Sequence, residues 1–270
     1  MSAKMNYVLG STNQEVKRLD IQARIFEKET LQTLRLAGIK KGMRCLDLGC
    51  GTGTTSLLLG YLVGKSGEVI GLDVNQERIR ICKRRVARKG INNVKFVLAG
   101  VYDTKFKDSS FDFVFSRFLF QHLTDPQRAL KEMLRITRKG GIVATEEFVH
   151  GSWLSYPYDP DVERLTQSYI KLAQLAGSDP FIARDLYKFF AKVGLNPSVG
   201  AYFVCVPMND ISVNKISILM AEILKENLLK NRIMSRIQFQ KMCKELRKYT
   251  KRQDFPLLYA LTFRVWAKKQ

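Results

Sequence analysis

A glycine-rich turn that directly follows an apolar segment restricts the fold of this 270-residue chain more than any other feature. The residues LDLGCGTG, 46–53, have the pattern of a strand that runs into a tight turn. Strand-like and helix-like periodicities then alternate as far as residue 148. Such alternation predicts a parallel sheet with helices on both faces, which binds ligands at the carboxyl ends of its strands. The turn therefore marks an expected binding site.

The same patterns place the expected elements along the chain. Residues 13–36 predict one long helix or two, ended by Gly38. Strands are predicted at 43–48, 68–73, 94–98, 111–116 and 142–148, with helices at 53–63, 75–89 and 126–138, the last of them ended by Gly140-Gly141. Beyond residue 148 we expect an aromatic-rich loop and a helix at 151–180, a helix at 181–193, a strand near 199–206, two amphipathic Lys-rich helices between about 211 and 250, and a strand at 257–267. We expect this last strand to form an antiparallel edge of the sheet.

Size and composition favour one α/β domain with appendages. Hydrophobic residues make up 46% of the chain and charged residues 26%, which is typical of a soluble globular protein. No apolar run reaches the roughly 18 residues that a membrane span needs. The start of the chain lacks the apolar region of a secretory signal, so we expect a cytoplasmic protein, either monomer or homodimer. The five cysteines never form a CxxC pair, which argues against a disulfide framework and a zinc site.

The chain is strongly basic. Its 45 Lys and Arg residues against 25 Asp and Glu residues leave a net charge of +20, and from residue 206 onward 14 basic residues face 5 acidic ones. Positive charge favours anionic partners, here RNA or an anionic membrane surface. The sequence contains no arginine-rich tract and no basic motif interleaved with aromatic residues, so a solvated basic surface is the simpler interpretation.

The glycine spacing separates two classes of nucleotide-binding turn. A nicotinamide-binding fingerprint reads G-x-G-x-x-G, whereas this turn reads G-x-G-x-G, with its third glycine at Gly53. Three further blocks follow in order: GLDVN (71–75), FDFVFSRFLFQHLTDPQRALKEMLRITRKGG (111–141) and EE (146–147). Together these motifs resemble the class I S-adenosylmethionine-dependent methyltransferases. The resemblance implies a Rossmann-like sheet of seven mostly parallel strands, helices on both faces and an antiparallel last strand.

The resemblance also implies S-adenosylmethionine as the cofactor and S-adenosylhomocysteine as the product. Asp73 would accept hydrogen bonds from both ribose hydroxyls, Asp47 would support the turn or the methionine amine, and Val74 would pack on the adenine. The turn residues would bring the backbone close to the methionine and ribose portions. They are Gly49, Cys50, Gly51 and Gly53.

Further cofactor contacts are expected from three other segments. Residues Ser116, Arg117 and Phe118 would pass beneath the transferred methyl group. Val101 and Tyr102 lie where adenine contacts are expected, and Tyr7, Arg18 and Gln22 belong to a segment that resembles an N-terminal helical lid and could reach the methionine carboxylate.

Two positions depart from the family pattern. Gly100 stands where the family usually has an aspartate that pairs with the adenine amino group, so the backbone N–H of Val101, or the side chain of Tyr102 or Asp103, would have to replace that contact. Lys139 stands where the family usually has a proline before two glycines. These departures predict weaker cofactor binding.

The acceptor is expected to be a small molecule. The segment SRFLF (116–120), followed by Gln121-His122-Leu123, is similar to the branch that methylates quinones, sterols and natural products. Two alternatives stay open: an RNA or protein methyltransferase that uses the basic surface, and a cofactor-binding scaffold without turnover. Candidate general bases are His122, Glu146 and Glu147, and a mechanism with no dedicated base is equally compatible.

The expected organisation has four parts. Residues 1–40 form the helical lid, 41–150 the cofactor-binding core, 151–180 a substrate-side insertion, and 181–270 the end of the sheet with cap helices at about 211–250. We interpret those two helices as a cap or an interface rather than core, because they are far longer than a hairpin connection needs. Tyr156 and Tyr158 in the insertion are candidates for lining a substrate pocket.

Overall fold

The computed structural model describes residues 8–10, 12–210, 213–252 and 257–270. Two short strands whose residues are almost all buried form the centre of the fold. Strands β1 (Arg44–Leu48) and β2 (Glu68–Asp73) are buried beyond their first residue. Such burial is typical of parallel strands that are covered on both faces. The two strands pair with each other in parallel. On its other side β2 pairs in parallel with β3 (Val94–Leu98), and β1 pairs in parallel with β4 (Phe111–Arg117).

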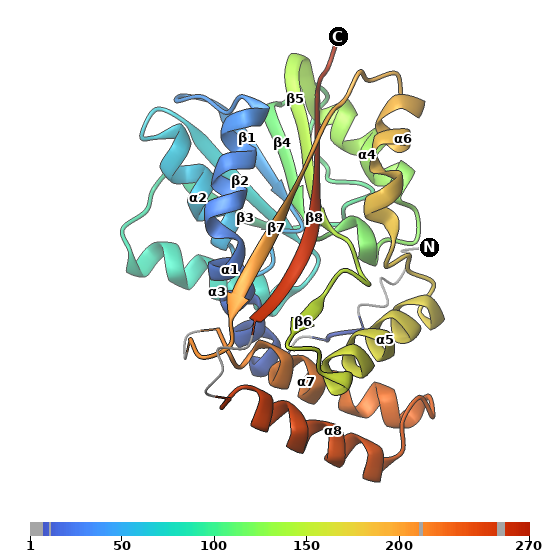
Figure 1. Cartoon of the computed structure of the whole chain (residues 1–270). Coiled ribbons are helices and arrows are strands. Elements are labelled where there is room, and N and C mark those ends of the chain that lie inside the picture. Colours follow the sequence, from blue (N-terminus) through green and yellow to red (C-terminus); the bar gives the residue numbers. More distant parts are fainter. Residues whose placement is uncertain (1–7, 11, 211–212, 253–256) are drawn as a thin grey trace.

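The complete sheet of the described residues contains eight strands in the order β3-β2-β1-β4-β5-β8, and β8 also pairs with β6 and β7 (Figure 1). Strands β1 to β5 are parallel, whereas β8 is antiparallel to all three of its partners. The predicted Rossmann-like class is therefore confirmed, with one strand more than expected because the insertion adds the three-residue β6. The remaining strands are β5 (Thr137–Phe148), β6 (Leu154–Tyr156), β7 (Ser198–Pro207) and β8 (Leu257–Lys268).

The last strand does not form an edge of the sheet, so that prediction is wrong. Strand β8 pairs with β5 through Thr262–Lys268 and with β7 through Leu257–Trp266. Because these two segments overlap, β5 and β7 must lie on opposite sides of β8. The edge strand is β7, which the chain reaches before β8.

Helices cover the two faces of the sheet in two groups. One group is α1 (Asn13–Ala37), α2 (Thr54–Val63) and α3 (Gln76–Arg88), which share an apolar core with residues of β1 and β4. The other face packs on α4 (Pro126–Ile136), the 3-10 turn η2 (Ile182–Asp185) and α6 (Leu186–Lys192). Among the described helices, none is both long enough and apolar enough to cross a membrane.

A third apolar cluster lies beyond the carboxyl ends of the parallel strands. It joins α5 (Pro160–Leu175), α7 (Ile216–Lys230) and α8 (Arg236–Tyr249) to the ends of β7 and β8 (Figure 1). The buried residues of α7 and α8, such as Leu224, Leu228, Met242 and Leu246, belong to this cluster. The interpretation of the two helices as a cap or an interface stays a prediction.

Three element boundaries differ from the sequence prediction or refine it. Helix α1 is one continuous helix, from the Thr12 N-cap to the left-handed Gly38. Helix α4 ends at Ile136 rather than 138, and β5 starts at Thr137 because the glycine pair continues the pairing with β8: the Gly140 N–H donates to the Lys269 carbonyl. The helix expected at 181–193 is divided into η2 and α6.

Close packing between β2 and its neighbours makes a prediction for Gly71. A β-carbon at Gly71 would lie 2.6 Å from ring carbons of Phe96 and 2.7 Å from Ser56 Oγ, and both neighbours are buried. We expect Gly71→Ala to lower the free energy of unfolding by about 1–3 kcal/mol, the usual cost of overpacking. Urea unfolding measures this change. Gly100→Ala is the matched control, because a β-carbon there meets no atom within 4 Å; equal losses in both variants would contradict the packing argument.

Candidate active site

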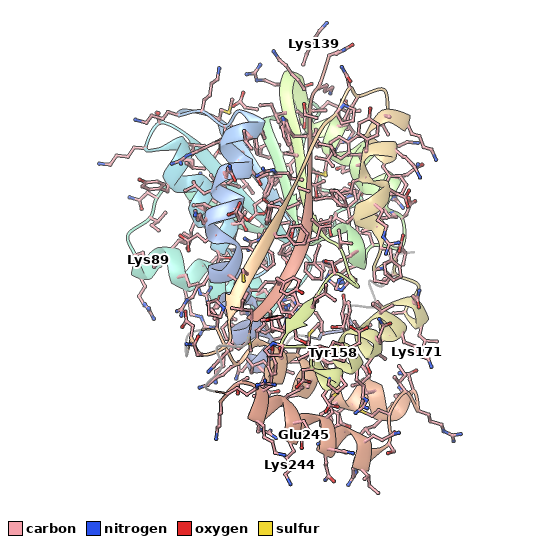
Figure 2. The ribbon with its side chains drawn as sticks, viewed as in Figure 1. Lys89, Lys139, Tyr158, Lys171, Lys244 and Glu245 are labelled. Atoms are coloured by element: carbon pink, nitrogen blue, oxygen red, sulfur yellow. The ribbon has the colours of Figure 1, made fainter. Side chains whose placement is uncertain are left out.

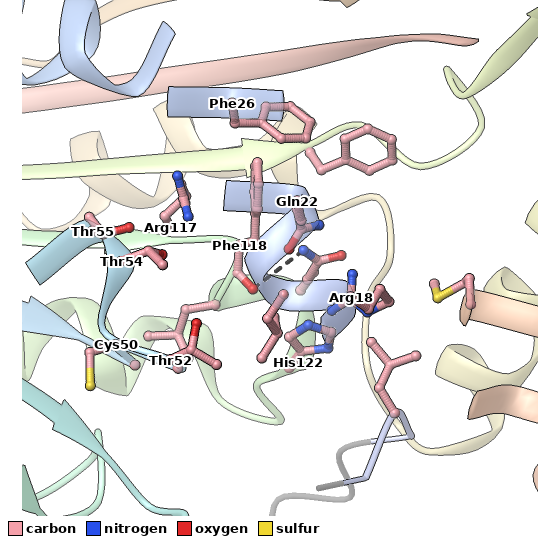
Figure 3. Close-up of a pocket in the computed structure, with 18 of the residues that line it drawn as sticks. Arg18, Gln22, Phe26, Cys50, Thr52, Thr54, Thr55, Arg117, Phe118 and His122 are labelled. Atoms are coloured by element: carbon pink, nitrogen blue, oxygen red, sulfur yellow. Dashed lines mark hydrogen bonds between the residues drawn. The ribbon is translucent and has the colours of Figure 1, made fainter. Parts of the chain in front are cut away.

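A cavity opens at the carboxyl ends of the parallel strands, where the strand–helix alternation predicted a site. Its lining comes from the glycine turn, the ends of β2, β4 and β5, and helices α1, α5 and α7. Figure 3 shows the part of the cavity formed by α1, the glycine turn, the start of α2 and the exit of the fourth strand. The labelled residues on it include Arg18, Gln22, Phe26, Cys50, Thr52, Thr54, Thr55, Arg117, Phe118 and His122.

Backbone hydrogen bonds hold the glycine turn against the end of β2. The N–H groups of Gly49 and Cys50 both donate to the Leu72 carbonyl, each at 2.8 Å. Gly53 is in the left-handed region, with φ +78°, and a β-carbon there would lie 2.8 Å from Phe96. Only glycine satisfies both conditions. Gly49, Cys50 and Gly51 line the cavity, whereas Gly53 acts behind it by closing the turn into α2.

Asp73 lies at the end of β2 and faces the cavity. Its Oδ2 accepts from the Gly51 N–H at 3.0 Å and its Oδ1 from the Asn75 N–H at 2.8 Å. Burial raises the pKa of Asp73, and the Arg78 guanidinium, 3.9 Å from Oδ2, opposes that rise. Each carboxylate oxygen can accept a further hydrogen bond. Asp73 is thus able to receive the two hydroxyls of a ribose.

Beside Asp73 the cavity wall also contains apolar side chains. Val74 is 54% exposed and lines the cavity, and Val101 is buried on the same wall. An exposed valine next to a buried carboxylate fits a nucleoside, whose base is flat and apolar on its faces and whose sugar carries hydroxyls. The residues present therefore fit the adenosine portion of the predicted cofactor.

Asp47 supports the turn from below. It is buried, and its Oδ2 accepts from the Ser56 hydroxyl at 2.6 Å. Burial raises the pKa of Asp47 to about 6. The side chain also lines the cavity, so both roles predicted for it, support of the turn and contact with the methionine amine, are geometrically available.

The adenine side of the cavity contains fewer polar side chains than the sequence prediction allowed. The Tyr102 hydroxyl accepts from the N–H groups of Thr124 and Asp125, each at 3.1 Å, and Tyr102 does not line the cavity. Asp103 pairs with Lys105 at the surface. Neither side chain therefore takes the place of the adenine-binding aspartate that the family usually has at the position of Gly100. Val101 alone of these residues lines the cavity.

The exit of β4 turns sharply at Phe118. This residue has φ +54°, unusual for a bulky side chain, and its N–H donates to the Glu146 carbonyl at 2.8 Å. The turn leads into the 3-10 segment η1 (Phe120–His122) and places Arg117 and Phe118 on the cavity. Ser116 points elsewhere, to Thr145 Oγ1 at 2.9 Å, and does not line the cavity.

Helix α1 supplies the predicted lid contacts in part. Arg18 and Gln22 line the cavity, and Tyr7 lies outside the described residues. The Arg18 guanidinium already donates to both Glu15 oxygens, at 2.7 and 2.9 Å. Arg117 lies nearer the start of α2 and donates to Thr30 Oγ1 at 3.2 Å (Figure 3).

Of the three candidate bases, only His122 lines the cavity. Burial lowers the pKa of His122 to about 3, so the ring is neutral at pH 7. Glu146 is buried and accepts from Thr30 Oγ1 at 2.7 Å, while Glu147 accepts from the N–H groups of Leu119 and Phe120, both at 2.7 Å. The expectation that these two carboxyls face the cleft is wrong, because they stabilise the β4 exit and α1 from behind.

The sequence prediction missed much of the remaining lining. His150 was not among the candidates, although it follows β5 by two residues and so comes to the same edge of the sheet as His122. Tyr156 and Tyr158, the candidates for lining the pocket, are 65% and 68% exposed and do not line it. The missed lining residues include Phe26, Gln121, Phe148, Trp153, Tyr169 and Ser217.

Comparison with known proteins agrees with this geometry. A sequence profile described as a methyltransferase domain matches residues 39–191, more than half of the chain. The chain belongs to the class I S-adenosylmethionine-dependent methyltransferases. The family and the cofactor predicted from the sequence are thereby confirmed.

Relatives of this methyltransferase share part of their length with it. An uncharacterized methyltransferase of Schizosaccharomyces pombe is 36% identical over 164 residues, 58% of each chain, and a demethylmenaquinone methyltransferase of Staphylococcus aureus is 35% identical over 171 residues, 63% of each chain. The chain thus spans about three-fifths of the length of these relatives. A phosphoethanolamine N-methyltransferase of Haemonchus contortus has a TM-score of 0.64 at 17% identity, over 99% of this chain and 61% of that one, which shows a common fold.

The buried carboxyl of Glu147 makes a prediction for the dependence of stability on pH. Burial raises the pKa of Glu147 from 4.5 to about 8. The folded state therefore favours the protonated carboxyl, and this stabilisation is complete below pH 4.5 and is lost as the pH rises through 8. Glu147→Gln keeps an acceptor for the two N–H groups but does not titrate. We expect its free energy of unfolding to fall less than that of the wild type between pH 5 and pH 9, as measured by urea unfolding. The exposed Glu226→Gln is the control, and a wild-type slope in Glu147→Gln would contradict this prediction.

Proposed function

We propose that the chain transfers the methyl group of S-adenosylmethionine to a small-molecule acceptor. The observation that carries the proposal is one continuous cavity, which has a nucleoside-binding wall at Asp73 and Val74 and an aromatic wall formed by α1, β5, α5 and α7. The name of the relative from Staphylococcus aureus, a demethylmenaquinone methyltransferase, supports a quinone-type acceptor.

The residues around the nucleoside-binding wall would orient the cofactor. Asp73 would receive the ribose hydroxyls, Val74 and Val101 would contact the adenine, and the glycine turn with Asp47 would hold the methionine portion. Because Arg18 is paired with Glu15, we propose Arg117 and Gln22 as the contacts of the methionine carboxylate.

When bound, S-adenosylmethionine would supply an electrophilic methyl carbon: the acceptor's electron pair would form the new bond to this carbon, and the electrons of the broken carbon–sulfur bond would stay on sulfur. The chain's own residues align the acceptor with that bond and exclude water. Phe118 lies at the junction of the two walls, with its ring edge-on to Phe26 at 4.9 Å. His122 lies on the cavity, but burial lowers its pKa to about 3 and makes it a weak base, so we propose a transfer without a dedicated general base.

The four lysines labelled in Figure 2 give no support for an RNA or protein acceptor, and this alternative stays a prediction. Figure 2 shows Lys139, Lys171 and Lys244 pointing outward from β5, α5 and α8, and Lys89 pointing outward just after α3, rather than toward one groove. A nucleic-acid site would need its basic residues on one face. The cytoplasmic location, the monomeric or homodimeric state and the division into lid, core, insertion and cap stay predictions.

Removal of the Asp73 carboxylate tests the cofactor assignment. We expect Asp73→Ala to weaken binding of S-adenosylmethionine and S-adenosylhomocysteine by about 1–3 kcal/mol, because the ribose hydroxyls lose a charged partner. Isothermal titration measures both ligands, with NAD as a negative control. Asp103→Ala serves as the matched variant, since Asp103 pairs with Lys105 at the surface. Unchanged affinity in Asp73→Ala would overturn the ribose assignment, and no binding of either ligand to the wild type would overturn the proposed function.

Gly100 allows the opposite test, a gain of affinity. The family resemblance places an adenine-binding aspartate at this position, and a β-carbon on Gly100 would meet no atom within 4 Å. We expect Gly100→Asp to tighten binding of S-adenosylhomocysteine by about 1 kcal/mol, the net worth of one hydrogen bond. Gly100→Ala separates the carboxylate from the effect of any side chain. If the two variants bind equally, the carboxylate makes no contact with the adenine.

A further inference from the structure

The residues that give the aromatic wall its character are uncharged, and Arg18 of α1 lines the same cavity beside them. The wall joins Phe26 of α1, Phe148 and His150 at the end of β5, Leu165 and Tyr169 of α5, and residues of α7. Arg18, the charged residue whose field reaches His150, is paired with Glu15 through two hydrogen bonds. A charged acceptor would enter this wall without an opposite charge to meet it, so burial there favours a neutral molecule.

One hydroxyl on this wall has no partner among the described residues. Ser217, in the first turn of α7, lines the cavity and is 5% exposed, and its Oγ is buried without a hydrogen bond. Natural proteins pair almost all buried polar atoms. An unpaired hydroxyl that lies against a cavity is therefore explained by a ligand that pairs with it. Ser217 also lies outside residues 39–191, the part that matches the family profile.

A chain of hydrogen bonds determines which ring nitrogen of His150, the second polar side chain on the wall, can accept a hydrogen bond. Gln121 Nε2 donates to the Phe118 carbonyl, which orients the amide so that Oε1 faces His150 Nε2. His150 must then carry its proton on Nε2, because the neutral ring donates from one nitrogen and accepts at the other. The ring is held by Tyr169, stacked at 4.6 Å, and by the edge of Phe148 at 4.8 Å. Nδ1 remains as an acceptor, to which no described residue donates.

We propose that Ser217 and His150 select the acceptor, an uncharged molecule that contains a ring and a hydroxyl group. The O–H of this group donates to His150 Nδ1, and its oxygen accepts from Ser217 Oγ. This inference rests on the proposed function for the identity of the site, and it adds the two residues that recognise the acceptor by hydrogen bonds. Specificity then depends on α7, a helix that packs against α1 and α5 and that the family profile does not include.

Three small aromatic probes of one ring system test the proposal. They are 2-naphthol, which is uncharged and has a hydroxyl, 2-methoxynaphthalene, which keeps the oxygen but has no O–H, and the anion 2-naphthoate. Titration calorimetry is carried out on the protein saturated with S-adenosylhomocysteine and on the protein alone. We expect 2-naphthol to bind about ten-fold more tightly than either of the others, the equivalent of one hydrogen bond. Equal binding of the three probes, or binding of none, would overturn the proposal.

The variants assign that preference to the two residues. Ser217→Ala should weaken both 2-naphthol and 2-methoxynaphthalene by about ten-fold, and its Tm should stay the same or rise, because the lost hydroxyl has no partner in the protein. A fall in Tm would show a structural role and would contradict the proposal. His150→Phe should weaken 2-naphthol alone and so remove the difference between the two probes. Ser168→Ala, a buried serine of α5 that does not line the cavity, is the matched control.

Titration with S-adenosylhomocysteine distinguishes a failure of the proposed function from a failure of the roles of Ser217 and His150. Tight binding of this product together with no preference among the probes would overturn the roles of Ser217 and His150 and leave the proposed function intact. Failure of the product to bind would overturn the proposed function, and the probe preference of the protein alone would still decide whether these residues read a neutral hydroxyl.

Discussion

The cofactor half of the cavity depends on one set of backbone hydrogen bonds at the ends of two neighbouring strands. The Leu72 carbonyl accepts from Gly49 and Cys50, and the next residue, Asp73, accepts from Gly51. The first βα turn is thus fastened to the second strand, and the carboxylate that would bind a ribose also holds the turn that would carry the methionine portion. Because the same carboxylate accepts from the N–H of Asn75, the residue that caps α3, three elements meet at one side chain.

A buried polar layer beneath α1 holds the other half of the site. Arg117, Glu146 and Arg264 are register partners on β4, β5 and β8, so they follow one another on the same face of the sheet. Thr30 of α1 donates to Glu146 and accepts from Arg117, while Arg264 reaches Thr33 at 3.5 Å. Helix α1 therefore does more than cover the cavity. Its C-terminal half is fixed to the sheet by this layer, and its N-terminal half carries Arg18, Gln22 and Phe26 onto the cavity.

The parts of the site that sequence could predict are those set by local spacing. Gly49, Gly51 and Asp73 follow strands whose apolar runs are visible in the sequence, so their position at one edge of the sheet follows from the topology. The aromatic wall has no such signal, since α1 and α7 meet only in the folded chain: Gln14 Nε2 of α1 donates to Glu222 Oε2 of α7 across 208 residues. The same dependence on contacts between distant segments explains which predictions were wrong. That β8 lies inside the sheet, and that Glu146 and Glu147 point behind the cavity, depends on pairing with a strand more than 100 residues away.

Four ionisable groups at or behind the cavity have pKa values that burial shifts toward the neutral form. Burial raises the pKa of Asp47 to about 6 and of Glu147 to about 8, and it lowers the pKa of His122 and of His150 to about 3. For transfer of a methyl group from a sulfonium to a neutral acceptor, positive charge is concentrated in the reactants and spread over more atoms in the transition state. Water and unpaired anions stabilise concentrated charge most, so a site that excludes them from the reacting atoms would raise the energy of the reactants relative to the transition state. The aromatic wall and the neutral histidines would contribute to the reaction in this way, because they place no charge beside the acceptor.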